Sequence, residues 1–497
     1  MRTTSKSMAL GLLPMLFFCA LASPVVAQQP APTEVEDKAD SAHLMEDADR
    51  IAAQVVNIRG LPLLRVMKKG VKTREALRAT LLEKIALEYT DQTLKDEADV
   101  LKALGVFAQD VQYKALILDV LTEQIAGFYD PKGKELYIMQ GLPAALQRST
   151  MAHEIFHVIQ DQHFDILGMQ QPFKSSENSD FQLARSALLE GDATVLMMDF
   201  SLYESKTLPK SDARSVVDMP FIKSSLKAMN SQNLSAMESL ANAKKGKTPE
   251  KGAMARAPRF IKQLLMFPYI GGLRFVVHAR QGRTWPDINK MYAQAPVSTE
   301  QILHPERYFA GDEPVSLDVM PIVEGSTKIY DNVMGELQMK LMLQTQTLDP
   351  VSSGAKPISI DVEQATTGWD GDRLMGFRDA QGNVSTVHVS VWDSAREASE
   401  YYNAMKQSMV RRKLNSQLSD VQYKYGQATL LTHQKRHSYI EQWGDLVLSV
   451  EGVAQSPKAA KVVAVRESVW KSLKRTPFKQ IMQARSAALK DSEEPQQ

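Results

Sequence analysis

The chain has 497 residues, of which 44% are hydrophobic and 24% charged, and its net charge at pH 7 is +1. This composition excludes a disordered chain and allows two or three globular domains. Because positive and negative charges are nearly equal in number, there is no reason to expect nucleic acid or an anionic membrane surface as a partner. Cys19 is the only cysteine, so the rest of the chain can form neither disulfides nor a thiolate metal site.

Residues 1–27 are predicted to be a secretory signal peptide. Arg2 and Lys6 precede an apolar run over 8–22, which is shorter than the roughly 20 residues that span a bilayer. We therefore expect export through the inner membrane, a periplasmic or extracellular protein, and no stable membrane span once the signal is removed. Residues 28–41, rich in Pro, Gln and acidic side chains, are predicted to be a flexible leader.

Residues 150–163 contain a His-Glu-x-x-His motif, formed by His153, Glu154 and His157, within a helical pattern of apolar residues. Residues i and i+4 share one face of a helix, so the two imidazoles can bind one metal ion while Glu154 reaches a water beside it. Zinc suits this arrangement, because two histidines, a carboxylate and one open position make a tetrahedral hydrolytic site. The alternative is a core helix whose histidines only form hydrogen bonds.

Glu190 is the candidate third metal ligand. It lies in 181–198, a second segment with a helical apolar pattern, and its neighbours are mostly alanine and leucine. The alternative is that Glu190 is a solvated acid on a helix face, but its apolar neighbours do not indicate a solvated face. Gly191 weakens a helix by roughly 1 kcal/mol relative to Ala. Its presence predicts a close approach to the helix of His153.

The motif His153-Glu154-x-x-His157 with Glu190 downstream resembles the gluzincin group of zinc metallopeptidases, which includes the thermolysin-like enzymes. Longer pieces resemble a largely uncharacterised family of predicted bacterial metallopeptidases, and they lie at 121–131, 153–165, 190–193 and 298–305. The resemblance covers about residues 50–315. It implies a mainly α-helical zincin-like catalytic domain.

The chain departs from the thermolysin-like pattern at one position. Those enzymes carry an aspartate four residues after the glutamate ligand, where this chain has Thr194. Asp192 is close in sequence, but it is turned about 200° around the helix from Glu190. A role for Asp192 behind the metal ligands is therefore in doubt.

Other segments of the catalytic domain have weaker signals. Helices are predicted throughout 42–126, and residues 127–138 are predicted to form a β-hairpin. The resemblance makes Glu135–Met139 a candidate edge strand that binds substrate backbone as an added strand, although an ordinary hairpin covering the core fits equally well. Residues 231–257 are polar and predict a lid or an insertion, and 260–280 predicts a buried helix rather than a membrane span.

A peptidase also needs a donor for the oxyanion that develops at the scissile carbonyl. His304 and Tyr308 are the candidates, because they follow the short predicted helix that begins at Ser298. A single histidine before a proline is more often structural, and that interpretation stays open for His304.

Residues 318–477 predict an accessory α+β domain with an antiparallel sheet. Its predicted helices are 333–346, 394–412 and 457–473, and its predicted strands are 373–377, 384–392, 422–431 and 439–450. The motif at 368–373 resembles the same bacterial family but suggests no chemistry. Residues 478–497 are predicted to be a polar tail.

Taken together, the sequence predicts an α+β protein whose zincin-like domain, residues 42–315, is a zinc-dependent metallopeptidase. Its substrate would be a peptide or protein, with Glu154 as general base. A catalytically inactive metal-binding or structural envelope protein is one alternative, and a binding module that uses the C-terminal domain is another. A hydrolase of non-peptide amides fits the same residues. The pattern does not indicate cleavage preference or oligomeric state.

Overall fold

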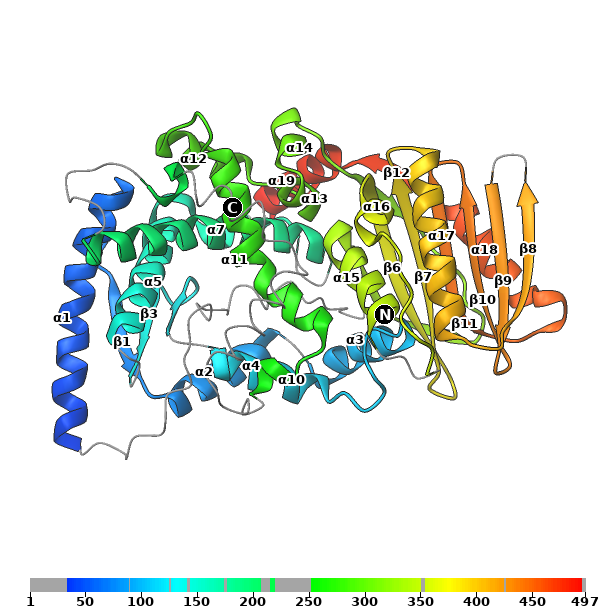
Figure 1. The fold of residues 1–497 in the computed structure, drawn as a ribbon, viewed down its shortest axis with the longest axis horizontal. Coiled ribbons are helices and arrows are strands. Elements are labelled where there is room, and N and C mark those ends of the chain that lie inside the picture. Colours follow the sequence, from blue (N-terminus) through cyan, green and yellow to red (C-terminus); the bar gives the residue numbers. More distant parts are fainter. Residues whose placement is uncertain are drawn as a thin grey trace.

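The computed structural model describes residues 34–88, 90–124, 127–140, 144–173, 177–206, 215–219, 252–349, 354–423 and 426–493. The predicted signal peptide and residues 231–251 of the polar segment lie outside these ranges. The molecule is elongated, with helices at one end and a large sheet at the other (Figure 1). Helix α1 (Glu34–Arg59) begins inside the predicted leader. The leader prediction is therefore wrong from Glu34 onward, because its Glu, Ala and Lys residues favour helix.

Helices make up most of the described residues as far as residue 310. Their bounds are α2 (Arg74–Glu88), α3 (Asp91–Ala103), α4 (Tyr113–Gln124), α5 (Ala144–Phe164), α6 (Ile166–Met169), α7 (Ser179–Glu204), α10 (Ala253–Arg256), α11 (Arg259–Ala279), α12 (Trp285–Met291), α13 (Thr299–Leu303) and α14 (Pro305–Ala310). Helix α7 is central, since it packs against α1, α5, α11 and α13. The core of this part therefore surrounds α7.

The predicted hairpin is part of a three-stranded sheet. It consists of β2 (Gly127–Asp130) and β3 (Glu135–Met139), joined by β1 (Lys68–Lys72) in the order β1-β3-β2. Strand β3 is central, so the prediction that it is the edge strand is wrong. Strand β1 contradicts the prediction of helices throughout 42–126. The helix that follows it begins after Thr73, whose hydroxyl accepts the Ala76 N–H. The edge strand that contacts α5 is β2.

The C-terminal part is built on a seven-stranded antiparallel sheet in the order β5-β6-β7-β11-β10-β9-β8, which confirms the α+β class. The strands are β4 (Val315–Asp318), β5 (Ser326–Asn332), β6 (Trp369–Asp379), β7 (Val384–Trp392), β8 (Gln417–Tyr423), β9 (Gly426–His433), β10 (Arg436–Trp443), β11 (Leu446–Ala454) and β12 (Lys474–Pro477). The helices are α15 (Gly335–Leu348), α16 (Val362–Thr366), α17 (Ala395–Arg412), α18 (Ala460–Ser472) and α19 (Phe478–Glu493). Strands β4 and β12 form a separate pair.

Helices α17 and α18 pack on the sheet, and the strands alternate accordingly. On β11, Val447 belongs to the apolar cluster that includes α17, whereas Leu448 and Val450 belong to the cluster that includes α18. This alternation is the period of two expected for a sheet covered on both faces. Arg378 of β6 joins the sheet to α3 through ion pairs with Asp96 at 2.5 Å and Asp99 at 2.7 Å.

Three predictions for the C-terminal part are wrong. Residues 422–431 are not one strand, because β8 ends at Tyr423 and β9, which pairs with it, begins at Gly426. Residues 439–450 are not one strand, because Gly444, with φ +58°, forms the turn between β10 and β11. Residues 478–493 are not a tail but helix α19. Phe478 is 3% exposed, and its ring stacks on Phe173 at 5.3 Å. The apolar spacing of Phe478, Ile481 and Met482 at i, i+3 and i+4 is the helical signal that the polar composition hid.

The motif at 368–373 has a structural role. The carboxylate of Asp372 accepts the backbone N–H groups of Met334 and Gly335, at 3.0 and 2.8 Å, at the start of α15. It also accepts the indole N–H of Trp369 and lies 3.1 Å from the His388 ring. The motif therefore caps α15 and ties that helix to the sheet.

Helices α7 and α11 cross in direct backbone contact. A Cβ atom on Gly191 would lie 2.2 Å from the carbonyl carbon of Gly272, and one on Gly272 would lie 2.0 Å from the carbonyl oxygen of Ala187. Gly191 therefore does mark a close helix approach, but the prediction that it approaches α5 is wrong, because the partner is α11. Within the described ranges, α11 is the one helix long and apolar enough to cross a membrane, and 67% of its apolar window is buried.

Candidate metal centre

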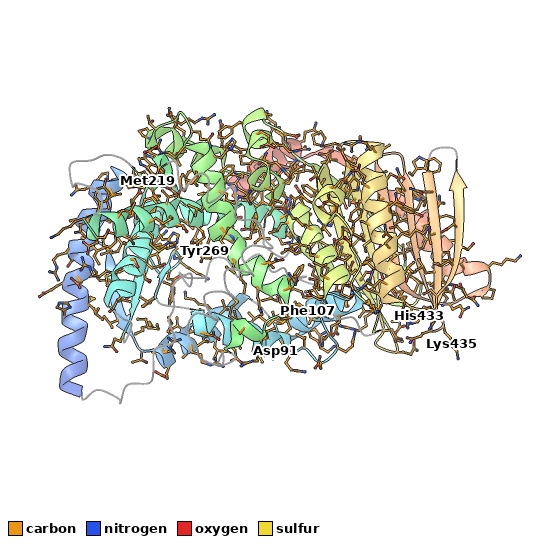
Figure 2. All side chains as sticks on the ribbon, in the orientation of Figure 1. Asp91, Phe107, Met219, Tyr269, His433 and Lys435 are labelled. Carbon is orange, nitrogen blue, oxygen red and sulfur yellow. The ribbon has the colours of Figure 1, made fainter. Side chains whose placement is uncertain are left out.

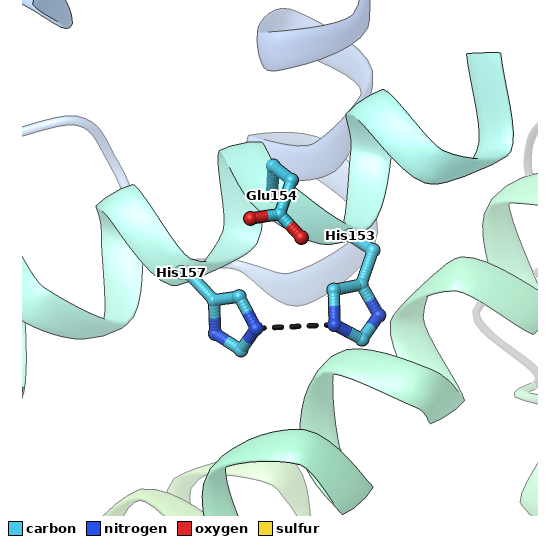
Figure 3. A group of neighbouring side chains, drawn as sticks. All are labelled: His153, Glu154 and His157. Carbon is cyan, nitrogen blue, oxygen red and sulfur yellow. Dashed lines mark hydrogen bonds between the residues drawn. The ribbon is translucent and has the colours of Figure 1, made fainter. Parts of the chain in front are cut away.

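Two helices bring four predicted site residues together. His153, Glu154 and His157 project from one side of α5 (Figure 3), and Glu190 faces them from α7. Their exposed fractions are 0%, 2%, 8% and 6%. The apolar residues that alternate with them, among them Ile155, pack in the core and fix α5 in place.

The three predicted ligand atoms converge. The Nε2 atoms of His153 and His157 are 3.0 Å apart, and the Oε2 atom of Glu190 lies 3.0 Å from the first and 3.3 Å from the second. Ligand atoms of a tetrahedral zinc ion, with bonds of about 2.0 to 2.1 Å, lie about 3.3 Å from one another. The triangle therefore has the dimensions of one face of such a tetrahedron.

Hydrogen bonding fixes which nitrogen of His157 faces the triangle. The side-chain N–H groups of Gln160 donate to the Leu189 carbonyl at 3.1 Å and to the Tyr292 hydroxyl at 2.6 Å. The Oε1 atom of Gln160 must then face Nδ1 of His157, 2.6 Å away, which makes that nitrogen the donor. A neutral His157 consequently presents the lone pair of Nε2 to the triangle, as a metal ligand must.

The pKa shifts show how the histidines and Glu190 affect one another's protonation when no cation is bound. Burial lowers the pKa of His157, but the Glu190 carboxylate outweighs burial and raises it to about 9. Burial lowers the pKa of His153, and despite burial the nearby histidines hold the pKa of Glu190 below its usual value. The cluster thus attracts positive charge, which a proton on His157 or a metal ion can supply.

Glu154 lies beside the triangle rather than within it. Its Oε2 atom accepts the backbone N–H of Tyr129 in β2 at 2.7 Å. Its Oε1 atom is buried and has no hydrogen-bond partner among the residues that the structure describes. Burial raises the pKa of Glu154 well above its usual value. A cation in the triangle would favour the ionised carboxylate, and Oε1 is then free to accept a proton from water.

Ligand-atom distances alone would also group Glu154 with the two histidines. One ligand atom from each of His153, Glu154 and His157 lies within 4.8 Å of the other two. Glu190 is the better third ligand, because its oxygen lies 3.0 and 3.3 Å from the two nitrogens. Glu154 keeps one oxygen on the β2 backbone, as a general base held in position would.

The structure does not bring His304 or Tyr308 to this cluster. The Nε2 atom of His304 lies 2.9 Å from Glu336 of α15, and the Tyr308 hydroxyl donates to the Gln294 carbonyl. The adjacent helix α13 is bonded to Asp180, which precedes Glu190 by ten residues, or about 15 Å along α7. The ring of Tyr269, a residue of α11 labelled in Figure 2, lies beside the histidines. Its centroid is 6.2 Å from that of the His153 ring.

His304 belongs instead to a buried acidic junction between α7, α13 and α15. Burial raises the pKa of Asp180 to about 8. Burial and the neighbouring Glu336 raise the pKa of Glu300 to about 10, although Arg307 opposes the shift. With a pKa of about 10, Glu300 would be protonated at neutral pH, although the Nη1 atom of Arg307 lies 3.2 Å from its Oε1 atom.

Glu300→Gln is expected to raise the free energy of unfolding at neutral pH. Glu300 has a pKa of about 4.3 when unfolded and about 10 when folded, so between these values the folded state binds the extra proton. Wild-type stability should fall as pH rises through this window, by at most about 1.4 kcal/mol per pH unit for one group. Urea unfolding of both proteins between about pH 5 and about pH 9 checks this. Parallel curves would contradict the protonated Glu300.

Four residues behind the site were not predicted from the sequence. Gln160 bonds His157, Tyr292 bonds Gln160, and Asp192 accepts the Tyr292 hydroxyl at 2.7 Å while pairing with Arg59 at 2.8 Å. The doubt about Asp192 is resolved, since it reaches His157 through two other side chains. Gln160 could have been found, because it follows His157 by three residues on the same helix face. The sequence carries no local signal for the distant Tyr292 and Arg59.

A surface hollow of about 530 Å³ adjoins the end of α5. Asp161, Phe164 and Tyr292 are among the residues that line it. One oxygen of Asp161 accepts the Tyr129 hydroxyl and the Lys134 ammonium group, each at 2.7 Å, and the other accepts the Ile166 N–H at 3.2 Å. The ring of Tyr292 stacks on that of Phe164 at 4.0 Å.

Comparison with known proteins reaches only the C-terminal part. Residues 324–466 match a family model described as a domain of unknown function, DUF8575. No curated protein and no solved structure matches the chain. The matched segment contains all seven strands of the large sheet and none of the metal-centre residues.

Proposed function

We propose that this chain is an exported zinc-dependent metallopeptidase, with zinc held by His153, His157 and Glu190. The observation that supports the proposal most is the triangle of ligand atoms, with edges of 3.0, 3.0 and 3.3 Å. In neutral His157 the lone pair of Nε2 is directed into this triangle, where a cation can bind it. Two imidazole nitrogens and one carboxylate oxygen are a ligand set that zinc enzymes use.

The residues around the triangle fit the hydrolysis of a peptide bond. Zinc at such a site supplies Lewis acidity, which polarises a carbonyl group and makes water acidic near neutral pH. Glu154 takes the proton from the water whose oxygen adds to the carbonyl carbon. It then returns this proton to the amine nitrogen as the C–N bond breaks. Tyr269 replaces His304 and Tyr308 as the candidate donor to the oxyanion, because its ring lies against His153.

A peptide or protein substrate and a periplasmic or extracellular location complete the proposal. They rest on the resemblance of the motifs and on the predicted signal peptide. A metal-binding or structural envelope protein without turnover is the second candidate. It is favoured by the burial of the four site residues, none of which is more than 8% exposed.

The proposal is tested by the zinc content of the chain without residues 1–27, measured by mass spectrometry. We expect about one zinc per chain in the wild type and little in His153→Ala or Glu190→Ala, because two remaining ligands bind zinc weakly. His163→Ala is the control, since His163 lies on α5 outside the triangle and bonds the Pro62 carbonyl. A wild type that holds no zinc when offered it contradicts the proposal.

A peptide library then separates the two candidate functions. The zinc-loaded wild type is expected to cleave some of its members, with new amino termini detected by mass spectrometry. Stoichiometric zinc without cleavage of any member would favour the structural protein.

A further inference from the structure

A continuous chain of buried side chains leads from the metal centre to helix α1. It runs from His157 through Gln160, Tyr292 and Asp192 to Arg59, and each link is a hydrogen bond of 2.6 to 3.2 Å. Its members come from α1, α5 and α7 and from the turn after α12. None of the five residues is more than 8% exposed.

The direction of every hydrogen bond in this chain follows from its last member. Asp192 is paired with Arg59 and can only accept, so the Tyr292 hydroxyl must donate to it. The phenolic oxygen is then left to accept an N–H group of Gln160. The other N–H of Gln160 is bonded to the Leu189 carbonyl, so the amide oxygen faces His157. The carboxylate thus determines that His157 carries its proton on Nδ1.

The ion pair at the end of the chain is not explained by stability. The side chains of Arg59 and Asp192 are 1% and 0% exposed. Removing two charges from water costs several kcal/mol, and apolar residues of similar size often stabilise as well or better. Arg59 is held between the rings of Trp285, at 4.2 Å, and Phe156, at 5.4 Å. Such a fixed charge is suited to orienting a hydrogen-bonded chain.

We infer that Gln160, Tyr292, Asp192 and Arg59 are positioning residues that hold His157 in its Nδ1–H form, with Nε2 directed at the metal. This inference rests on the proposed zinc site. Groups that bond the distal nitrogen of a metal-bound histidine fix its tautomer and orientation, and their loss typically costs 10- to 100-fold in metal affinity or activity. In this chain the group is an amide, polarised in turn by a phenol and a buried carboxylate.

Gln160→Leu is therefore expected to lower zinc affinity about 10- to 100-fold. Tyr292→Phe should lower it less, about 3- to 10-fold, because the Leu189 carbonyl still orients Gln160. Zinc affinity is measured on the chain without residues 1–27, in competition with a chromophoric chelator. The absorption spectrum of the cobalt-substituted protein is expected to change in Gln160→Leu, since a misoriented imidazole alters the coordination geometry.

Gln182→Leu is the matched control. Gln182 is also buried, lies on α7, and donates to the backbone carbonyls of Gln170 and Phe173, but it does not contact the metal centre. It should lose stability in urea but keep zinc affinity. Equal losses of affinity in Gln182→Leu and Gln160→Leu would overturn the inference.

The inference and the proposed function fail in different ways. A wild type that binds zinc and cleaves peptide, with unchanged affinity in Gln160→Leu, overturns the positioning role alone. A wild type that binds no zinc overturns both. Loss of affinity in Gln160→Leu and Tyr292→Phe, with Gln182→Leu unchanged, supports the positioning role whether or not a peptide substrate has been found.

Discussion

Glu154→Gln is expected to reduce peptide hydrolysis by about 10² to 10⁴-fold, which is the range that general acid–base groups contribute. Zinc content should remain near that of the wild type, because Glu154 is outside the ligand triangle. The amide oxygen of glutamine can still accept the Tyr129 N–H, now 2.7 Å from Oε2. The variant loses only the ability to take a proton from water. Cleavage rates with zinc-loaded proteins check the effect.

Glu300→Gln is the matched control for this substitution. Glu300 is also a buried glutamate with a raised pKa, but it lies at the α13 junction, away from the metal centre. The control should retain wild-type cleavage. Undiminished cleavage in Glu154→Gln would refute the role of Glu154 as base. Loss of zinc in Glu154→Gln would instead make Glu154 a ligand, together with the two histidines whose ligand atoms lie within 4.8 Å of its own.

The part of the metal centre that was predicted from sequence depends on local geometry. His153, Glu154 and His157 are placed by the repeat of a single helix, so their spacing alone predicts a shared face. Glu190 was predicted from a second helical pattern with a carboxylate among apolar residues. The structure brings these four side chains together, and whether they bind zinc stays a prediction.

The residues that could not be predicted depend on contacts between distant segments. His304 was chosen for its chemistry, but the position of Glu336 on α15 decides what its ring bonds. Tyr292 and Arg59 reach the centre only because α12 and the end of α1 are folded against α5 and α7. The periodicity of apolar residues in the sequence does not predict which distant segments contact one another.

The same limit explains the errors in the sheets. Strand β3 was identified from its pattern, but its neighbours were not, because β1 pairs with it from more than 60 residues away. Strands β10 and β11 are joined by a short turn at Gly444. The apolar pattern continues across this turn and therefore does not indicate it. Alternation predicts which residues face a core, whereas pairing partners depend on the whole fold.

Gly272→Ala is expected to lower the free energy of unfolding of the metal-free protein by about 3 kcal/mol or more, at the upper end of overpacking effects. The added methyl group would lie 2.0 Å from the Ala187 carbonyl oxygen and 2.9 Å from the Gly191 nitrogen. Both atoms are backbone, so α7 and α11 must separate for the group to fit. Urea unfolding of the purified variant measures the loss.

Gly271→Ala separates this backbone clash from an ordinary change within α11. Its methyl group would meet only the ring of Phe267, at 2.6 Å, and a side chain can move more easily than a helix. This variant should therefore lose less stability than Gly272→Ala, and equal losses would show that the two helices are not in backbone contact. Because Glu190 immediately precedes Gly191, separation of the helices should also shift the third ligand and weaken zinc binding in Gly272→Ala. The glycine contact would then be what sets the distance between Glu190 and the two histidines.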